Sequence, residues 1–93
     1  MTITIPDSRD GRVVQFFGSA DAMNILQEAV GNDQFHGAVG YLSSWNMNYP
    51  KVTLYFNARD LEITATYYNT VGEMQYCIGG IFNSSTKKFS FHS

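Results

Sequence analysis

The chain is poor in the residues that carry cross-links and charge. Among its 93 residues there is a single cysteine, Cys77, and charged residues make up only 15%. One cysteine excludes an intrachain disulfide. The charged fraction lies below the roughly 25% of an average domain, so uncharged polar residues must cover much of the surface. A surface of that composition suits adaptable contacts with other proteins, as antibody paratopes show.

Basic residues and long apolar runs are also scarce. Six Lys and Arg against eight Asp and Glu give a net charge of −2, which disfavours nucleic-acid binding because phosphate recognition needs a basic stripe. No apolar run approaches the ~18 residues of a membrane span. The N-terminal residues lack the basic and apolar segments of a signal peptide. We therefore expect a cytoplasmic protein that does not contact a membrane.

What is present fits one folded unit. Apolar residues make up 44% of the chain, which is enough for a single small core at this length. The sequence contains no internal repeat, low-complexity segment or linker. We expect residues 1–93 to form one compact domain that folds without a metal ion or cofactor.

The most informative stretch is 51–69, where two alternating runs flank a turn at Asn57–Asp60. Alternation with a period of two is typical of a half-buried antiparallel hairpin. In the expected register Phe56 pairs with Leu61, which places apolar residues on one face and hydroxyl and aromatic groups on the other. The apolar face contains Val52, Leu54, Phe56, Leu61, Ile63, Ala65 and Tyr67, and the polar face contains Thr53, Tyr55, Glu62, Thr64, Thr66 and Tyr68.

A second hairpin is expected at the end of the chain. Residues 73–82 and 87–92 flank Asn83–Thr86, a segment made of turn-forming residues. In the expected register Gly80 lies opposite Phe89, so that the missing glycine side chain leaves room for the aromatic ring.

The first half of the chain predicts two short strands, a helix and another strand. Thr2–Ile5 and Arg12–Phe17 are expected to be strands. Apolar residues then recur at helical spacing over 20–30, and Gly31 is a natural stop. Ala38–Trp45 alternates in the manner of a strand. The expected connectors are Asn32–His36 and Trp45–Pro50.

This order predicts an α+β fold. Consecutive strands without intervening helices pair antiparallel. We expect a single amphipathic helix packed on a mostly antiparallel twisted sheet of about five to six strands, with the other face of the sheet at least partly solvated.

The sequence offers little for catalysis. In the expected register Cys77 lies opposite His92, an arrangement that can generate a thiolate nucleophile. His92 lies close to the end of the chain, however, and no third residue is placed to orient the imidazole. His36 has no Cys, His or carboxylate at a ligand spacing from it. We expect neither a catalytic nor a metal site.

The leading functional hypothesis is a non-enzymatic protein-binding module. Such a module acts as an inhibitor, an immunity protein or an adaptor by occupying the surface of a partner of unknown identity. Exposed aromatic residues are frequent anchors of protein interfaces. The predicted partner-binding residues are Trp45, Tyr49, Tyr55, Glu62 and Tyr68.

Two alternatives involve other surfaces. The chain is a small-ligand carrier if Gly37, Gly40, Gly79 and Gly80 line an apolar pocket between helix and sheet, where a ligand approaches the backbone closely. It is a homodimer if an exposed edge strand pairs with the same strand of a second copy.

Overall fold

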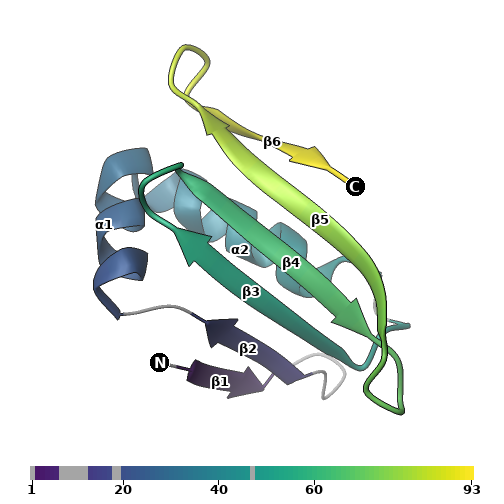
Figure 1. The fold of residues 1–93 in the computed structure, drawn as a ribbon. Coiled ribbons are helices and arrows are strands. Elements are labelled where there is room, and N and C mark those ends of the chain that lie inside the picture. The colour runs from purple at the N-terminus through teal and green to yellow at the C-terminus, as the bar shows by residue number, and fades with distance from the viewer. Residues whose placement is uncertain (1, 7–12, 18–19, 47) are drawn as a thin grey trace.

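The computed structural model describes residues 2–6, 13–17, 20–46 and 48–93, which form an α+β fold of two layers. A six-stranded sheet makes one layer, and two helices pack together against one of its faces (Figure 1). The elements in chain order are β1 (Thr2–Pro6), β2 (Val13–Phe17), α1 (Ala20–Val30), α2 (Asn32–Ser44), β3 (Lys51–Asn57), β4 (Glu62–Tyr68), β5 (Met74–Asn83) and β6 (Lys88–His92).

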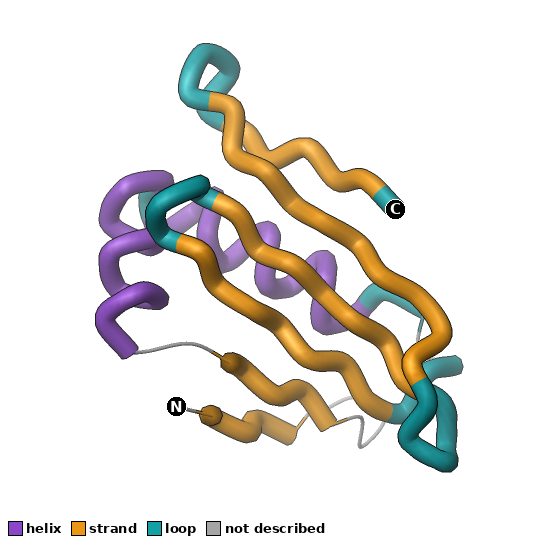
Figure 2. The backbone as a smooth tube through the Cα atoms, viewed as in Figure 1, coloured by secondary structure: helices purple, strands orange, loops and turns teal. Residues whose placement is uncertain are grey.

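The strands lie in the sheet in the same order as in the chain, from β1 to β6. Four of the five pairings are antiparallel, and the pairing of β2 with β3 is parallel. A parallel pair needs a long crossover connection, and both helices belong to this one. Figure 2 shows both helices in purple, with α2 passing behind the orange strands and α1 to their left. The prediction of an antiparallel-rich sheet is therefore confirmed, with one parallel pair as the exception.

The prediction of a single helix was wrong. The helix over 20–30 is present as α1, but the expected connector Asn32–His36 and the expected strand Ala38–Trp45, except for its last residue, belong to α2. The local sequence of this segment is compatible with either a strand or a helix. Burial against the sheet favours the helix, because most helical stability in proteins comes from packing an apolar face. The buried residues of α2 follow helical spacing: Phe35, Ala38 and Leu42.

The core lies between the two layers. α1 packs against β3, and α2 packs against β4 and β6. The core contains the alternating apolar strand residues that the sequence predicted, and residues of both helices complete it. The largest fully buried members are Leu26, Leu42, Val52, Leu54, Ile63 and Tyr67.

Both predicted hairpins are present, but their registers were wrong by two residues. Phe56 pairs with Ile63 instead of Leu61, and Phe82 pairs with Phe89 instead of Lys87. In each turn the extra loop residue takes a left-handed backbone, with φ of 53° at Leu61 and 62° at Lys87. Because side chains alternate with a period of two, a shift of two residues leaves every side chain on its predicted face.

Each of the three tight turns between β3 and β6 begins with an asparagine. A side-chain amide oxygen at this position accepts backbone N–H groups and so replaces ladder bonds where the strands separate. The Oδ1 atoms of Asn57, Asn69 and Asn83 accept bonds from the N–H groups of Asp60 (3.1 Å), Glu73 (2.9 Å) and Ser85 (2.8 Å), respectively.

Candidate functional site

The five predicted partner-binding residues lie on opposite faces of the sheet. Tyr55, Glu62 and Tyr68 lie on the face that no described helix covers, which we call the open face. Trp45 and Tyr49 lie on the helix side and pack against the core. The structure therefore does not bring the five residues together, and each group must be considered separately.

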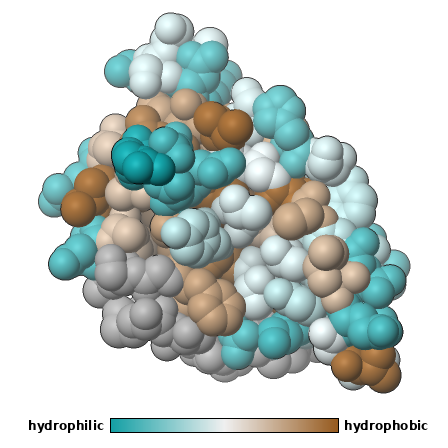
Figure 3. Space-filling view, viewed as in Figure 1, coloured by the Kyte–Doolittle hydropathy of each residue, from teal (hydrophilic) through white to brown (hydrophobic). Residues whose placement is uncertain are grey.

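The open face has an uncharged middle and a charged margin. In the described strands its charged residues are Lys51, Glu62 and Lys88, and each is the first residue of its strand. Figure 3 shows this face, with pale colours of intermediate hydropathy over much of the middle of the sheet. The residues of the middle are Gln15, Phe17, Thr53, Tyr55, Thr64, Thr66, Cys77 and Gly79.

Two exposed aromatic residues of this face occupy paired positions in neighbouring strands. Tyr55 is 54% exposed and pairs with Phe17, which is 38% exposed. Tyr68 is held more closely, because its hydroxyl lies 3.5 Å from the Thr53 Oγ1 and the Lys51 Nζ lies 5.0 Å from its ring centroid. Tyr55 and Phe17 are thus the aromatic groups that this face presents most openly to a partner.

The helix side holds a second aromatic cluster, in which rings touch one another. The Trp45 ring centroid lies 4.8 Å from that of Tyr67 and 4.9 Å from that of Tyr76. Tyr67 is fully buried, and its hydroxyl donates a 2.9 Å bond to the Leu42 carbonyl. That carbonyl is one of the last four of α2, which accept no backbone hydrogen bond from within the helix. The cluster therefore fastens the end of α2 to the sheet.

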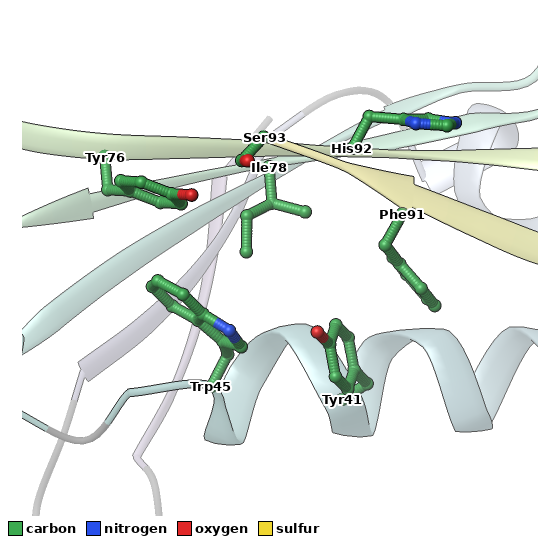
Figure 4. A pocket seen from close by; sticks show the side chains of 7 residues that line it. All are labelled: Tyr41, Trp45, Tyr76, Ile78, Phe91, His92 and Ser93. Carbon is green, nitrogen blue, oxygen red and sulfur yellow. The ribbon is translucent and has the colours of Figure 1, made fainter.

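Beside this cluster an open cleft of ≈ 120 Å³ lies between α2 and the strands β5 and β6. Figure 4 shows Tyr41 and Trp45 rising from α2 towards Ile78 and Phe91, which descend from the sheet. The Tyr41 and Phe91 ring centroids are 4.5 Å apart. Tyr76 lines the same cleft, so four aromatic side chains surround it.

Sequence reasoning missed Tyr41, Tyr76 and Phe91 as cleft residues. The available signal was the spacing of Tyr41 and Trp45, which are four residues apart and therefore share one side of a helix. Interpreting this segment as a strand placed them on one strand face instead and concealed their relation to α2.

The four glycines predicted to line a pocket do not line this cleft. Gly37 and Gly40 are exposed on α2, and a side chain on either would meet no atom within 4 Å. Gly80 does leave room for an aromatic ring, as predicted, but the ring belongs to Phe91: a Cβ on Gly80 would lie 2.9 Å from it. A Cβ on Gly79 would meet the Glu62 carboxylate on the open face at 3.7 Å.

The expected pairing of Cys77 with His92 was wrong, because the hairpin register differs. His92 lies opposite Gly79, and Cys77 lies opposite Thr66, whose hydroxyl oxygen is 3.6 Å from the thiol sulfur. His92 is one of the residues that line the cleft, although Figure 4 shows its side chain turned away from the centre.

Comparison with known proteins adds no functional information. The sequence matches no protein-family model, no curated protein and no solved structure. Within the residues that the structure describes, no three His, Cys, Asp or Glu side chains are grouped so that they hold a metal ion. Neither described helix is long and apolar enough to cross a membrane. Functional inference therefore depends on the open face and the aromatic cleft.

Proposed function

We propose that this chain is a non-enzymatic protein-binding module that occupies a partner's surface with the open face of its sheet. One observation carries the proposal: an uncharged middle with the exposed aromatic residues Phe17 and Tyr55 in paired strand positions is bordered by charged residues at the strand starts. Protein interfaces have this anatomy, with few charges and many aromatic residues at the centre and a polar rim.

The chemistry of the face supports binding more than reaction. The middle of the face carries mainly hydroxyls, aromatic rings and one thiol, and the neighbour of the Cys77 thiol is the Thr66 hydroxyl rather than a base. A nucleophile needs an adjacent base or a lowered pKa to react. The same hydroxyl groups serve well as hydrogen-bond partners for another protein. An inhibitor, immunity protein or adaptor requires no more than this.

A matched pair of tyrosine variants tests the proposal. The wild-type chain is first used to capture its partner from native lysate, and the partner is identified by mass spectrometry. Tyr55→Ala is expected to weaken the purified complex by at least tenfold, in keeping with an aromatic anchor at an interface. The control is Tyr41→Ala, which removes a tyrosine of similar exposure (44%) from the helix side. Equal loss of binding in both variants, or in neither, would contradict the proposal.

A second candidate function is that of a small-ligand carrier, and the aromatic cleft favours it. Small-molecule sites are concave and lined mainly by apolar and aromatic side chains with a few polar groups. The cleft shares the concave shape and the aromatic walls, and its lining also carries polar groups, from the phenols of Tyr41 and Tyr76 and from His92 and Ser93. Its volume of ≈ 120 Å³ matches one small group of a ligand, with the rest extending into solvent.

A further inference from the structure

We infer that the cleft between α2 and the β5–β6 hairpin binds a methylated ammonium group. The inference rests on the second candidate function and names the ligand class of that site. It combines three properties of the cleft: the aromatic rings around it, the electrostatics of the helix end beside it, and its volume.

The rings come as two touching pairs. Tyr41 packs with Phe91 at 4.5 Å between centroids, and Trp45 packs with Tyr76 at 4.9 Å. In Figure 4 the two pairs flank the cleft, and Ile78 lies between them on the sheet side. Aromatic rings attract cations through their quadrupoles, and groups of such rings recognise quaternary ammonium ions. The packing within each pair holds the rings in place before a ligand arrives.

The end of α2 adds a negative potential at the same place. The helix ends at Ser44, and Trp45 is its C-cap residue, so the carbonyl end of the helix dipole lies at the cleft. The last turn of α2 contains no basic residue. No Lys or Arg is among the described residues that line the cleft. The titratable imidazole among the lining residues is that of His92, whose side chain points away from the centre of the cleft in Figure 4. A cation is therefore favoured over an anion, because the helix end attracts positive charge and no Lys or Arg among the lining residues opposes it.

The volume selects the kind of cation. A cavity of about 150 Å³ holds a benzene ring, so ≈ 120 Å³ accommodates a group of trimethylammonium size. A bare ammonium ion is compact and strongly hydrated, and losing that water against aromatic walls is costly. Methyl groups weaken the hydration and supply apolar surface for the rings.

The test uses choline and its uncharged analogue 3,3-dimethylbutan-1-ol, which has the same shape. Trp45 is the only tryptophan, so its indole N–H signal in an NMR spectrum and its fluorescence report directly on the cleft. We expect choline to shift the indole signal with at least a fivefold lower Kd than the analogue, in keeping with a cation–π contribution of about 1 kcal/mol or more.

Two variants locate the binding. Tyr41→Leu keeps an apolar side chain but removes the ring, and it is expected to weaken choline binding at least threefold. Tyr55→Leu removes a ring from the open face and is expected to leave choline binding unchanged. The NMR spectrum of each variant also shows whether it is folded. If Tyr41→Leu does not fold, Tyr76→Leu tests the other ring pair in the same way.

Each further outcome has a separate meaning. Equal affinity for choline and the uncharged analogue would overturn the ammonium inference and retain a ligand pocket. No shift with either compound would overturn both the inference and the carrier function, while the open-face proposal depends on the Tyr55 experiment alone. Short peptides with lysine or trimethyllysine distinguish the sources: tighter binding of the methylated peptide assigns the group to a partner protein, and binding of choline alone assigns it to a free small molecule.

Discussion

The two aromatic sets of this protein are chemically alike, but the sheet separates them into different environments. Beneath the sheet, Tyr67 is fully buried, touches Trp45 and bonds to the end of α2. Above it, Tyr55 is 54% exposed and its neighbour across the parallel pair is Phe17. The difference shows that a tyrosine in this chain stabilises the fold or remains available for contact according to the face it occupies. Adjacent residues can therefore have opposite roles.

The strongest test of this comparison is a pair of neighbours, Tyr67 and Tyr68. Tyr67→Ala is expected to lower the free energy of unfolding by about 3–5 kcal/mol, the range for losing a buried aromatic ring. Tyr68→Ala, on the open face, is expected to cost less than about 1 kcal/mol, because an exposed cation–π contact contributes only that much. Chemical denaturation measures both. Similar losses in the two variants would mean that the faces are not distinct.

The adjacent glycines Gly79 and Gly80 allow the two faces of the sheet to be compared by adding a single methyl group to each. Gly80→Ala places a Cβ 2.9 Å from the Phe91 ring, and overpacking of this kind is expected to cost about 1–3 kcal/mol. Gly79→Ala faces the flexible Glu62 carboxylate at 3.7 Å, and its effect is expected to stay within about 0.5 kcal/mol. Thermal unfolding of the two variants provides the measurement. A larger loss for Gly79→Ala would reverse the assignment of the faces.

The smallest expected effect concerns the turn between β5 and β6, which sets the register of that hairpin and so the face on which each of its side chains lies. Lys87 has a φ of 62°, and a left-handed backbone costs a residue other than glycine roughly 1–2 kcal/mol. Lys87→Gly relieves that strain but gives the unfolded chain more freedom, so we expect a net stabilisation of about 0.5 kcal/mol. Lys88→Gly, in the neighbouring strand position, is expected to destabilise. A loss of stability in Lys87→Gly would indicate a different turn.

Local patterns were sufficient for much of the fold. Helix 20–30 and both hairpins were predicted, since their periodicities are carried by residues close together in the chain. The faces of β3 and β4 were also correct. The registers were not, because a turn residue such as Leu61 adopts a left-handed backbone without the glycine that normally signals it.

The candidate sites depended more on tertiary contacts. The sequence indicated that Tyr55 and Tyr68 share a polar face, and they do. It also grouped Trp45 with them, although the Trp45 ring packs against Tyr76 on the other side of the sheet. The aromatic cleft was not predicted, because its walls come from α2, β5 and β6, and α2 was interpreted as a strand.

By itself the sequence determined the composition of each sheet face, because side-chain alternation is a property of the extended backbone and survives a shift of two residues. Only the tertiary structure decided which face the helices cover. Burial of Phe35, Ala38 and Leu42 against the sheet made 32–44 a helix, and the position of that helix buried one aromatic set and left the other exposed. The cleft exists because the end of α2 and the end of β6 meet there, which no local pattern encodes.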